Sequence, residues 1–179
     1  MPDYNKIEEM VEDVIVKEGG FVNHKADRGG ATNFGITHKT LSEWFRRPVS
    51  IQEVKELDIE LAKIIYRRNY YFRPGINELP NEIQPLVFDS AINHGPKTAI
   101  KLLQIVLKRL GFPIEADGII GPITIKGANQ AQEKMDNSFI NSIVDERINY
   151  YEAIVKMNST QEVFLKGWKN RAESFRKEV

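Results

Sequence analysis

Two carboxylate residues lie near the start of the chain, in surroundings that should differ. Glu18 directly precedes Gly19-Gly20, and Asp27 follows nine residues later in a polar segment. A protonated carboxylic acid paired with an ionised carboxylate is the arrangement that hydrolyses glycosidic bonds. Thr32, in the same segment, has a hydroxyl that would position a water molecule or hydrogen-bond to the second carboxylate. Glu18, Asp27 and Thr32 are therefore the candidate catalytic residues.

The element that positions Glu18 is an amphipathic helix. Its apolar positions follow the helical spacing i, i+3, i+4, i+7 and i+8, and they are Ile7, Met10, Val11, Val14 and Ile15. Extending this stripe places Glu18 on the buried face of the last turn. Burial and the negative end of the helix dipole both disfavour a charged carboxylate, so we expect Glu18 to hold a proton near neutral pH. The two glycines end the helix and leave room for a substrate.

The same residues also have a simpler interpretation. Glu18 would then be a solvent-facing residue at a frayed helix end, and Asp27 a turn former before Arg28-Gly29-Gly30. Residues 21–37 are rich in Gly, Asn and Asp, which predicts a loop or a short irregular hairpin. Spacing alone leaves both interpretations of the two carboxylates open.

Helical periodicity and capping signals dominate the rest of the chain. Thr37 and Asp58 are candidate N-caps, and Ser50 with Glu53 forms a capping box. Apolar spacing predicts further helices near 83–94, 97–110, 137–157 and 160–177, with a Gly/Pro-rich loop over 111–123. The predicted fold is therefore an all-α helical bundle with one short polar loop or hairpin that carries active-site residues.

Composition excludes several classes of protein. The chain has 179 residues, no cysteine and a net charge of zero, with no dense Lys/Arg stripe, which argues against nucleic acid as a partner. Neither a membrane span nor a signal peptide is visible, so we expect synthesis in the cytoplasm and export by a route other than Sec. The histidines at 24, 38 and 94 lack metal-ligand spacing, so we expect no metal and no cofactor.

Two motifs make the chain similar to a known family. Glu18-Gly-Gly-Phe-Val-Asn23, followed by Asp27-x-Gly-Gly-x-Thr-Asn-x-Gly-Ile-Thr37, resembles the signature of glycoside hydrolase family 108, and Phe88-Asp-Ser-Ala-Ile-Asn-His-Gly95 resembles its second motif. His24-Lys25 departs from the Asp-Pro of many members. The family consists of lysozyme-like N-acetylmuramidases from phages, prophages and bacteria, and some are described as secretion activators.

The second half of the chain resembles the peptidoglycan-binding domain that accompanies this family. The matching segments are Ala116-Asp-Gly-Ile-Ile-Gly-Pro-x-Thr124 and Gly167-Trp-x-x-Arg171. The resemblance implies a lysozyme-like fold, α+β at most, with a catalytic region over 1–95 and a peptidoglycan-binding region over 96–179. Only the Gly95-Pro96 break separates the two, so we expect one compact body, a monomer, in which the apolar residues of 97–110 pack against the N-terminal half.

Four further residues are candidates for contact with the substrate. Asp89 and Asn93 lie one helical turn apart and would meet saccharide hydroxyl or N-acetyl groups, or else anchor the helix end at Gly95. Tyr66 and Tyr70 share a helix face and would stack on sugar rings, although aromatic residues at this spacing more often belong to a core. Trp44 and Trp168 are predicted to be core residues.

The resemblance implies an N-acetylmuramidase that cleaves the β-1,4 bond between N-acetylmuramic acid and N-acetylglucosamine, with Glu18 as general acid. It would act on peptidoglycan at the cell wall or in the periplasm, and its similarity to phage-type lysozymes favours inversion at the anomeric carbon. One alternative is a catalytically idle peptidoglycan-binding or secretion-associated protein on the same fold. Another is a hydrolase of a different β-1,4 glycan, such as chitin.

Overall fold

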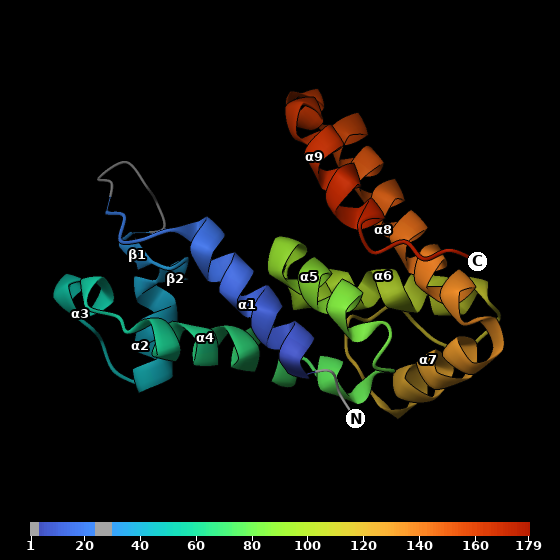
Figure 1. Cartoon of the computed structure of the whole chain (residues 1–179), viewed down its shortest axis with the longest axis horizontal. Helices are drawn as coiled ribbons and strands as arrows, with labels where there is room; N and C mark the ends of the chain where they lie inside the picture. Colours follow the sequence, from blue (N-terminus) through green and yellow to red (C-terminus); the bar gives the residue numbers. More distant parts are fainter. Residues whose placement is uncertain (1–3, 24–29) are drawn as a thin grey trace. The chain divides into compact units, whose positions relative to one another are not determined.

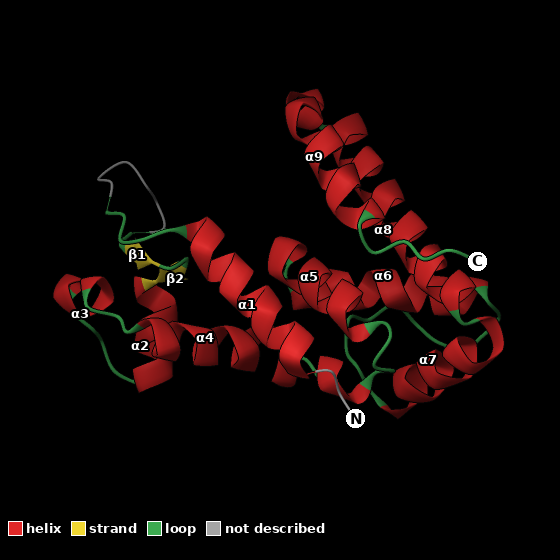
Figure 2. Ribbon diagram, viewed as in Figure 1, coloured by secondary structure: helices red, strands yellow, loops and turns green. Residues whose placement is uncertain are grey.

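The computed structural model describes residues 4–23 and 30–179. Within these ranges the chain forms nine α-helices, three short helical turns of other types and one two-stranded sheet (Figures 1 and 2). The prediction of a mostly helical fold with one short hairpin is confirmed. Contacts divide the chain after Asn69 into a first unit that ends there and a second unit that begins at Tyr70.

The first unit is built on the pairing of α1 (Tyr4–Glu18) with α4 (Ile59–Arg67). The predicted apolar stripe of α1 is the buried side of that helix, where Ile7, Val11, Val14 and Ile15 are at most 6% exposed. On α4, Ala62 and Ile65 are fully buried. Ion pairs of Lys63 with Glu12 and of Arg67 with Glu8 connect the polar sides of the two helices.

Two short helices, α2 (His38–Phe45) and α3 (Ile51–Lys55), complete this unit, and both begin at predicted caps. The Thr37 side chain accepts a hydrogen bond from the backbone N–H of Thr40. Ser50 and Glu53 form the full capping box at the start of α3. Each cap satisfies N–H groups that the first helical turn leaves without partners, which explains why these local signals predict the helix starts correctly.

A π-helical turn, η1 (Arg68–Phe72), follows α4 directly and contains the boundary between the two units. It was not predicted, because periodicity analysis assumes a constant 3.6 residues per turn. A 3-10 turn, η2 (Ile76–Glu78), then leads to α5 (Gln84–His94). Single π-turns occur in helices frequently at functional sites.

The second unit is a helical assembly around α6 (Pro96–Arg109), which packs against α5, α7 (Pro122–Met135) and α8 (Asn137–Met157). The turn η3 (Ser159–Gln161) leads to α9 (Glu162–Glu173), which packs along α8. Helix α7 was not among the predicted helices, and only its entry turn was recognised. The apolar residues of α6 find their partners in this assembly, and Leu102, Leu103, Val106 and Leu107 are buried.

The contacts group α5 with the helices that follow it, although the family resemblance assigns residues 84–94 to the first region. The expectation that the chain is one compact body stays a prediction, and a single calorimetric transition would support it. None of the described helices is long and apolar enough to cross a membrane.

Candidate active site

Glu18 occupies the last position of α1, as predicted. Gly19 follows in the left-handed conformation (φ 73°) and donates its N–H to Ile15 O at 3.2 Å, which ends the helix. The predicted burial of Glu18 is wrong, because its side chain is exposed. The buried stripe of α1 ends at Ile15, and residues 16–18 all face solvent.

A tight hairpin lies beside this helix end. Strands β1 (Thr32–Asn33) and β2 (Ile36–Thr37) pair in antiparallel register, with Thr32 opposite Thr37. The segment after α1 joins the hairpin through Val22, whose N–H and C=O each bond to Thr32 at 2.8 Å. Thr32 is thus half-buried and fixed through its backbone. The predicted irregular hairpin is confirmed.

Gly35, in the hairpin turn, brings the Glu18 carboxylate and the Tyr66 hydroxyl close together. A Cβ atom at Gly35 would lie 3.0 Å from Glu18 Cγ and 3.1 Å from Glu18 Oε2, and it would collide with the Tyr66 hydroxyl. Gly35 also has φ 72°, a conformation that L side chains rarely adopt. Only glycine fits this position, and its missing side chain is what lets the two oxygen atoms approach the turn.

The Tyr66 hydroxyl holds the turn from the side of α4. It donates a hydrogen bond to Phe34 O at 3.1 Å, and Phe34 is itself in the left-handed region (φ 51°). A non-glycine residue in that region stores strain that its surroundings must offset. Tyr66 is 5% exposed, so its ring does not fit the predicted stacking on a sugar. The structure instead places its hydroxyl against the Phe34-Gly35 turn, which Glu18 also adjoins.

The structure does not place two other predicted site residues, Asp27 and Tyr70, beside Glu18, Gly35 and Tyr66. Asp27 lies outside the described residues, and its role as the second carboxylate stays a prediction. Tyr70 lies in the π-turn η1, is half-buried, and belongs to the second unit, whereas Tyr66 belongs to the first. The predicted shared helix face of the two tyrosines therefore rested on a regular α-helix that the chain does not form there.

Asp89 is the centre of a buried ion-pair cluster in the second unit. Arg147 Nη2 donates to Asp89 Oδ2 at 2.5 Å, and Arg171 donates to both Asp89 oxygens, with Nη2 at 2.7 Å from Oδ1. Arg147 is fully buried and also donates its Nε–H to the Tyr151 hydroxyl. Because both carboxylate oxygens of Asp89 are engaged by arginine, the predicted contact of this residue with a saccharide is not supported.

Asn93 lies at the edge of the same cluster. Its Nδ2 donates to Asp89 O at 2.9 Å and to Asp89 Oδ2 at 3.2 Å, while the residue as a whole is exposed. The side chain thus helps to anchor the end of α5 and also faces solvent. Substrate contact by Asn93 stays a prediction.

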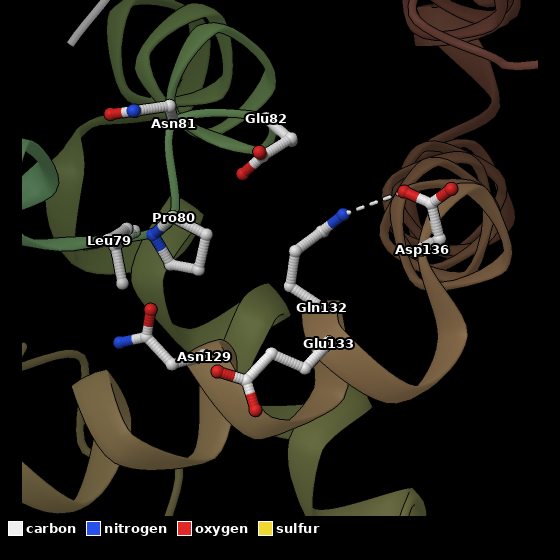
Figure 3. A pocket seen from close by; sticks show the side chains of 8 residues that line it. All are labelled: Leu79, Pro80, Asn81, Glu82, Asn129, Gln132, Glu133 and Asp136. Atoms are coloured by element: carbon white, nitrogen blue, oxygen red, sulfur yellow. Dashed lines mark hydrogen bonds between the residues drawn. The ribbon is translucent and has the colours of Figure 1, made fainter. Parts of the chain in front are cut away.

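A polar depression of about 660 Å³ lies between the loop before α5 and helix α7 (Figure 3). Carboxylates and amides dominate its walls, and the lining residues are Leu79, Pro80, Asn81, Glu82, Asn129, Gln132, Glu133 and Asp136. In the part of the chain that the structure describes, no group of His, Asp or Glu residues has the arrangement of a metal site. The residues of this depression follow no sequence motif, so the depression was not predicted.

The mostly helical fold with one short hairpin agrees with the lysozyme-like fold that the sequence motifs predict. Residues 11–95 match the family model described as glycosyl hydrolase 108, and residues 98–173 match that of a predicted peptidoglycan domain. The solved structure of Brucella abortus SagA is 37% identical, covers 97% of this chain and 92% of its own, and has a TM-score of 0.71. The chain belongs to glycosyl hydrolase family 108. No curated protein matches it significantly.

The arginines that bind Asp89 were not predicted from the sequence. Arg147 and Arg171 lie 58 and 82 positions from Asp89. Arg171 was noted only as part of a motif, and Arg147 was not noted at all. The signal that could have indicated them is Asp89 itself, an aspartate among apolar residues with no basic residue at helical spacing. A buried carboxylate of this kind requires a cation from a distant part of the chain.

Proposed function

We propose that this protein is an N-acetylmuramidase that hydrolyses the β-1,4 bond between N-acetylmuramic acid and N-acetylglucosamine, with Glu18 as general acid. The observation that carries the proposal is the contact group at the hairpin turn, where Gly35 and Tyr66 adjoin the carboxyl group of Glu18. The turn is strained, and its residue next to the glutamate at the helix end is a glycine. These features suit a site that a bulky glycan must approach closely. Membership of the family supports glycoside hydrolysis as the reaction class.

The proposed reaction begins with proton transfer from Glu18 to the glycosidic oxygen. In the free protein the Glu18 side chain faces water. A glycan bound over it would exclude that water, which favours the protonated form that the reaction needs. Asp27 would act as the second carboxylate and Thr32 would position the attacking water, which corresponds to inversion at the anomeric carbon. The site of action would be the cell wall or the periplasm.

Digestion of purified peptidoglycan, followed by mass analysis of the products, tests the bond specificity. We expect fragments with muramic acid at the reducing end, and Glu18→Gln should lower the rate by about 10²–10⁴-fold, the contribution of a general acid. Glu9→Gln is the matched control, because Glu9 is an exposed glutamate on the same helix. Equal loss of activity in both variants, or an active Glu18→Gln, would contradict the assignment.

A catalytically idle peptidoglycan-binding protein is the second candidate, favoured by the match of residues 98–173 to a predicted peptidoglycan domain. This candidate predicts that the wild-type chain sediments with cell walls and releases no fragments from them. Release of fragments that depends on Glu18 excludes it.

A further inference from the structure

The four rings of His94, Tyr150, Tyr151 and Trp168 line a small cavity in the second unit, at the end of α5 and between α8 and α9. Its volume is about 240 Å³, and its wall also includes Ile154 and the amides of Asn93 and Gln161. We call it the ring pocket. It is separate from the polar depression of Figure 3, which shares none of its residues.

The rings form a continuous array. The ring centroids of His94 and Tyr150 are 5.2 Å apart, those of His94 and Tyr151 5.1 Å, and those of Tyr151 and Trp168 5.3 Å. Phe164, which is 52% exposed, stacks on Trp168 at 5.8 Å and extends the array to the surface. Such mutual packing fixes the orientation of each ring before any ligand arrives.

His94 contributes an uncharged ring to the wall of the ring pocket. His94 Nε2 is buried and has no hydrogen-bond partner. Burial, followed by the charge of Arg147, lowers the pKa of His94 to about 4, so the imidazole is neutral near pH 7. A neutral imidazole offers one N–H donor and one lone pair. Because Nε2 itself is enclosed, His94 meets a ligand in the ring pocket as an uncharged aromatic ring.

We propose that the ring pocket binds one N-acetylated amino-sugar ring of a peptidoglycan glycan strand. A pyranose has an apolar C–H face for aromatic rings, and its hydroxyl and N-acetyl groups suit the amides of Asn93 and Gln161. The cavity of about 240 Å³ is small, which suits one ring, and the exposed Phe164, which stacks on Trp168, offers a surface for a neighbouring unit of the strand. The choice of ligand rests on the proposed function, but the pocket is built without Glu18.

The test uses the fluorescence of Trp168 in the full-length chain. Because the chain contains two tryptophans, Trp44→Phe leaves Trp168 as the sole reporter. The probe is chitotriose, three β-1,4-linked N-acetylglucosamine units. We expect a saturable change in Trp168 emission with a dissociation constant of about 1 mM, the order expected for a one-ring ligand.

Two variants in the same background test the wall of the ring pocket. Tyr150→Ala should weaken binding by about tenfold or more, as loss of an aromatic contact does. Gln161→Ala removes an amide at the short η3 turn with less risk to folding, and it should weaken binding several-fold. Asn129→Ala, in the depression of Figure 3, is the control that should bind as the parent does, and far-ultraviolet circular dichroism should show the same helix content in all variants.

Three outcomes would overturn the proposal: no saturable change with chitotriose, unchanged affinity in both ring-pocket variants, or a response to a free stem peptide instead of the sugar. Failure of the proposed function has a different signature. If Glu18 is not the catalytic acid, Glu18→Gln remains active on cell walls, while the emission of Trp168 still responds to chitotriose.

Discussion

At the scale of single residues, the turn at Phe34-Gly35 lies against the candidate acid Glu18. Glu18 is exposed, so the protein core does not orient its carboxyl group. Among the described residues, the Gly35 turn lies against its side chain, and the Tyr66 hydroxyl lies against the same turn. A small change at the turn should therefore affect catalysis more than it affects folding.

Gly35→Ala tests this dependence. The new Cβ would collide with the Tyr66 hydroxyl, and the positive φ would cost about 1–2 kcal/mol. We expect the variant to fold with a lower melting temperature and to lose about 10²-fold in cell-wall hydrolysis, because small misplacements of catalytic groups have large effects. Adding Tyr66→Phe removes the colliding oxygen and should restore part of the activity. A Gly35→Ala protein with full activity would show that the turn does not position Glu18.

His94 gives the stability of the fold a pH dependence on the acid side. Burial and the nearby Arg147 and Arg171 lower its folded pKa to about 4 from an ordinary value of 6.5, with Asp89 opposing them. Since the unfolded chain binds this proton more readily, the stabilising effect is complete above pH 6.5 and is lost as the pH falls to about 4. His94→Gln lacks this titration.

Denaturant melts at both ends of this range measure the effect. The wild type should lose about 3 kcal/mol more than His94→Gln between neutral pH and pH 4, as the shift in pKa requires. Parallel losses in the two proteins would mean that the native fold does not lower the pKa of His94.

Sequence patterns correctly predicted the features that depend only on residues close together in the chain. The caps at Thr37 and Ser50, the end of α1 at Gly19 and the hairpin all follow from local chemistry. Exposure of Glu18 depends on where the packing of α1 against α4 stops, and the role of Asp89 depends on arginines 58 and 82 positions away. No periodicity within one helix contains that information.

At the scale of elements, Asp89 joins three helices. It lies on α5 and binds Arg147 of α8 and Arg171 of α9. Arg147 is fully buried, so its charge depends on Asp89 for compensation. The conspicuous motif around Asp89 therefore has a structural function in the second unit.

Asp89→Asn should destabilise the protein by about 3–5 kcal/mol, because it leaves a buried arginine without its counter-charge. Asp145→Asn is the matched control: Asp145 pairs with Arg176 at 2.6 Å, but its side chain is 59% exposed. An exposed pair contributes about 0–1 kcal/mol. Chemical denaturation of both variants measures the difference, and equal effects would contradict a special role for the buried cluster.

At the scale of the whole molecule, the family matches and the contacts assign α5 to different parts of the chain. By family match it closes the glycosyl hydrolase region, which ends at residue 95, and by contacts it belongs with the helices from α6 onward. Its side chains complete the charge cluster of α8 and α9.

Two fragments of the chain test which of these two assignments of α5 is correct. Residues 70–179 should fold as a helical protein with a cooperative melt, because this fragment retains Asp89 and the partners of α6. Residues 96–179 lack α5, which leaves Arg147 and Arg171 without their carboxylate, and this fragment should melt broadly or aggregate. Circular dichroism against temperature compares them. A fragment 96–179 as stable as 70–179 would show that α5 is dispensable to the second unit.

The position of α5 has a consequence for making chimaeric enzymes from relatives. Recombination at Gly95-Pro96, where the two family matches meet, would combine an Asp89 from one parent with the arginines of another. A crossover after Asn69 would keep all three residues from the same parent. Libraries with the crossover at Gly95-Pro96 should contain fewer soluble chimaeras than libraries with the crossover after Asn69. The loss should be greatest where the parents differ around Asp89, Arg147 and Arg171.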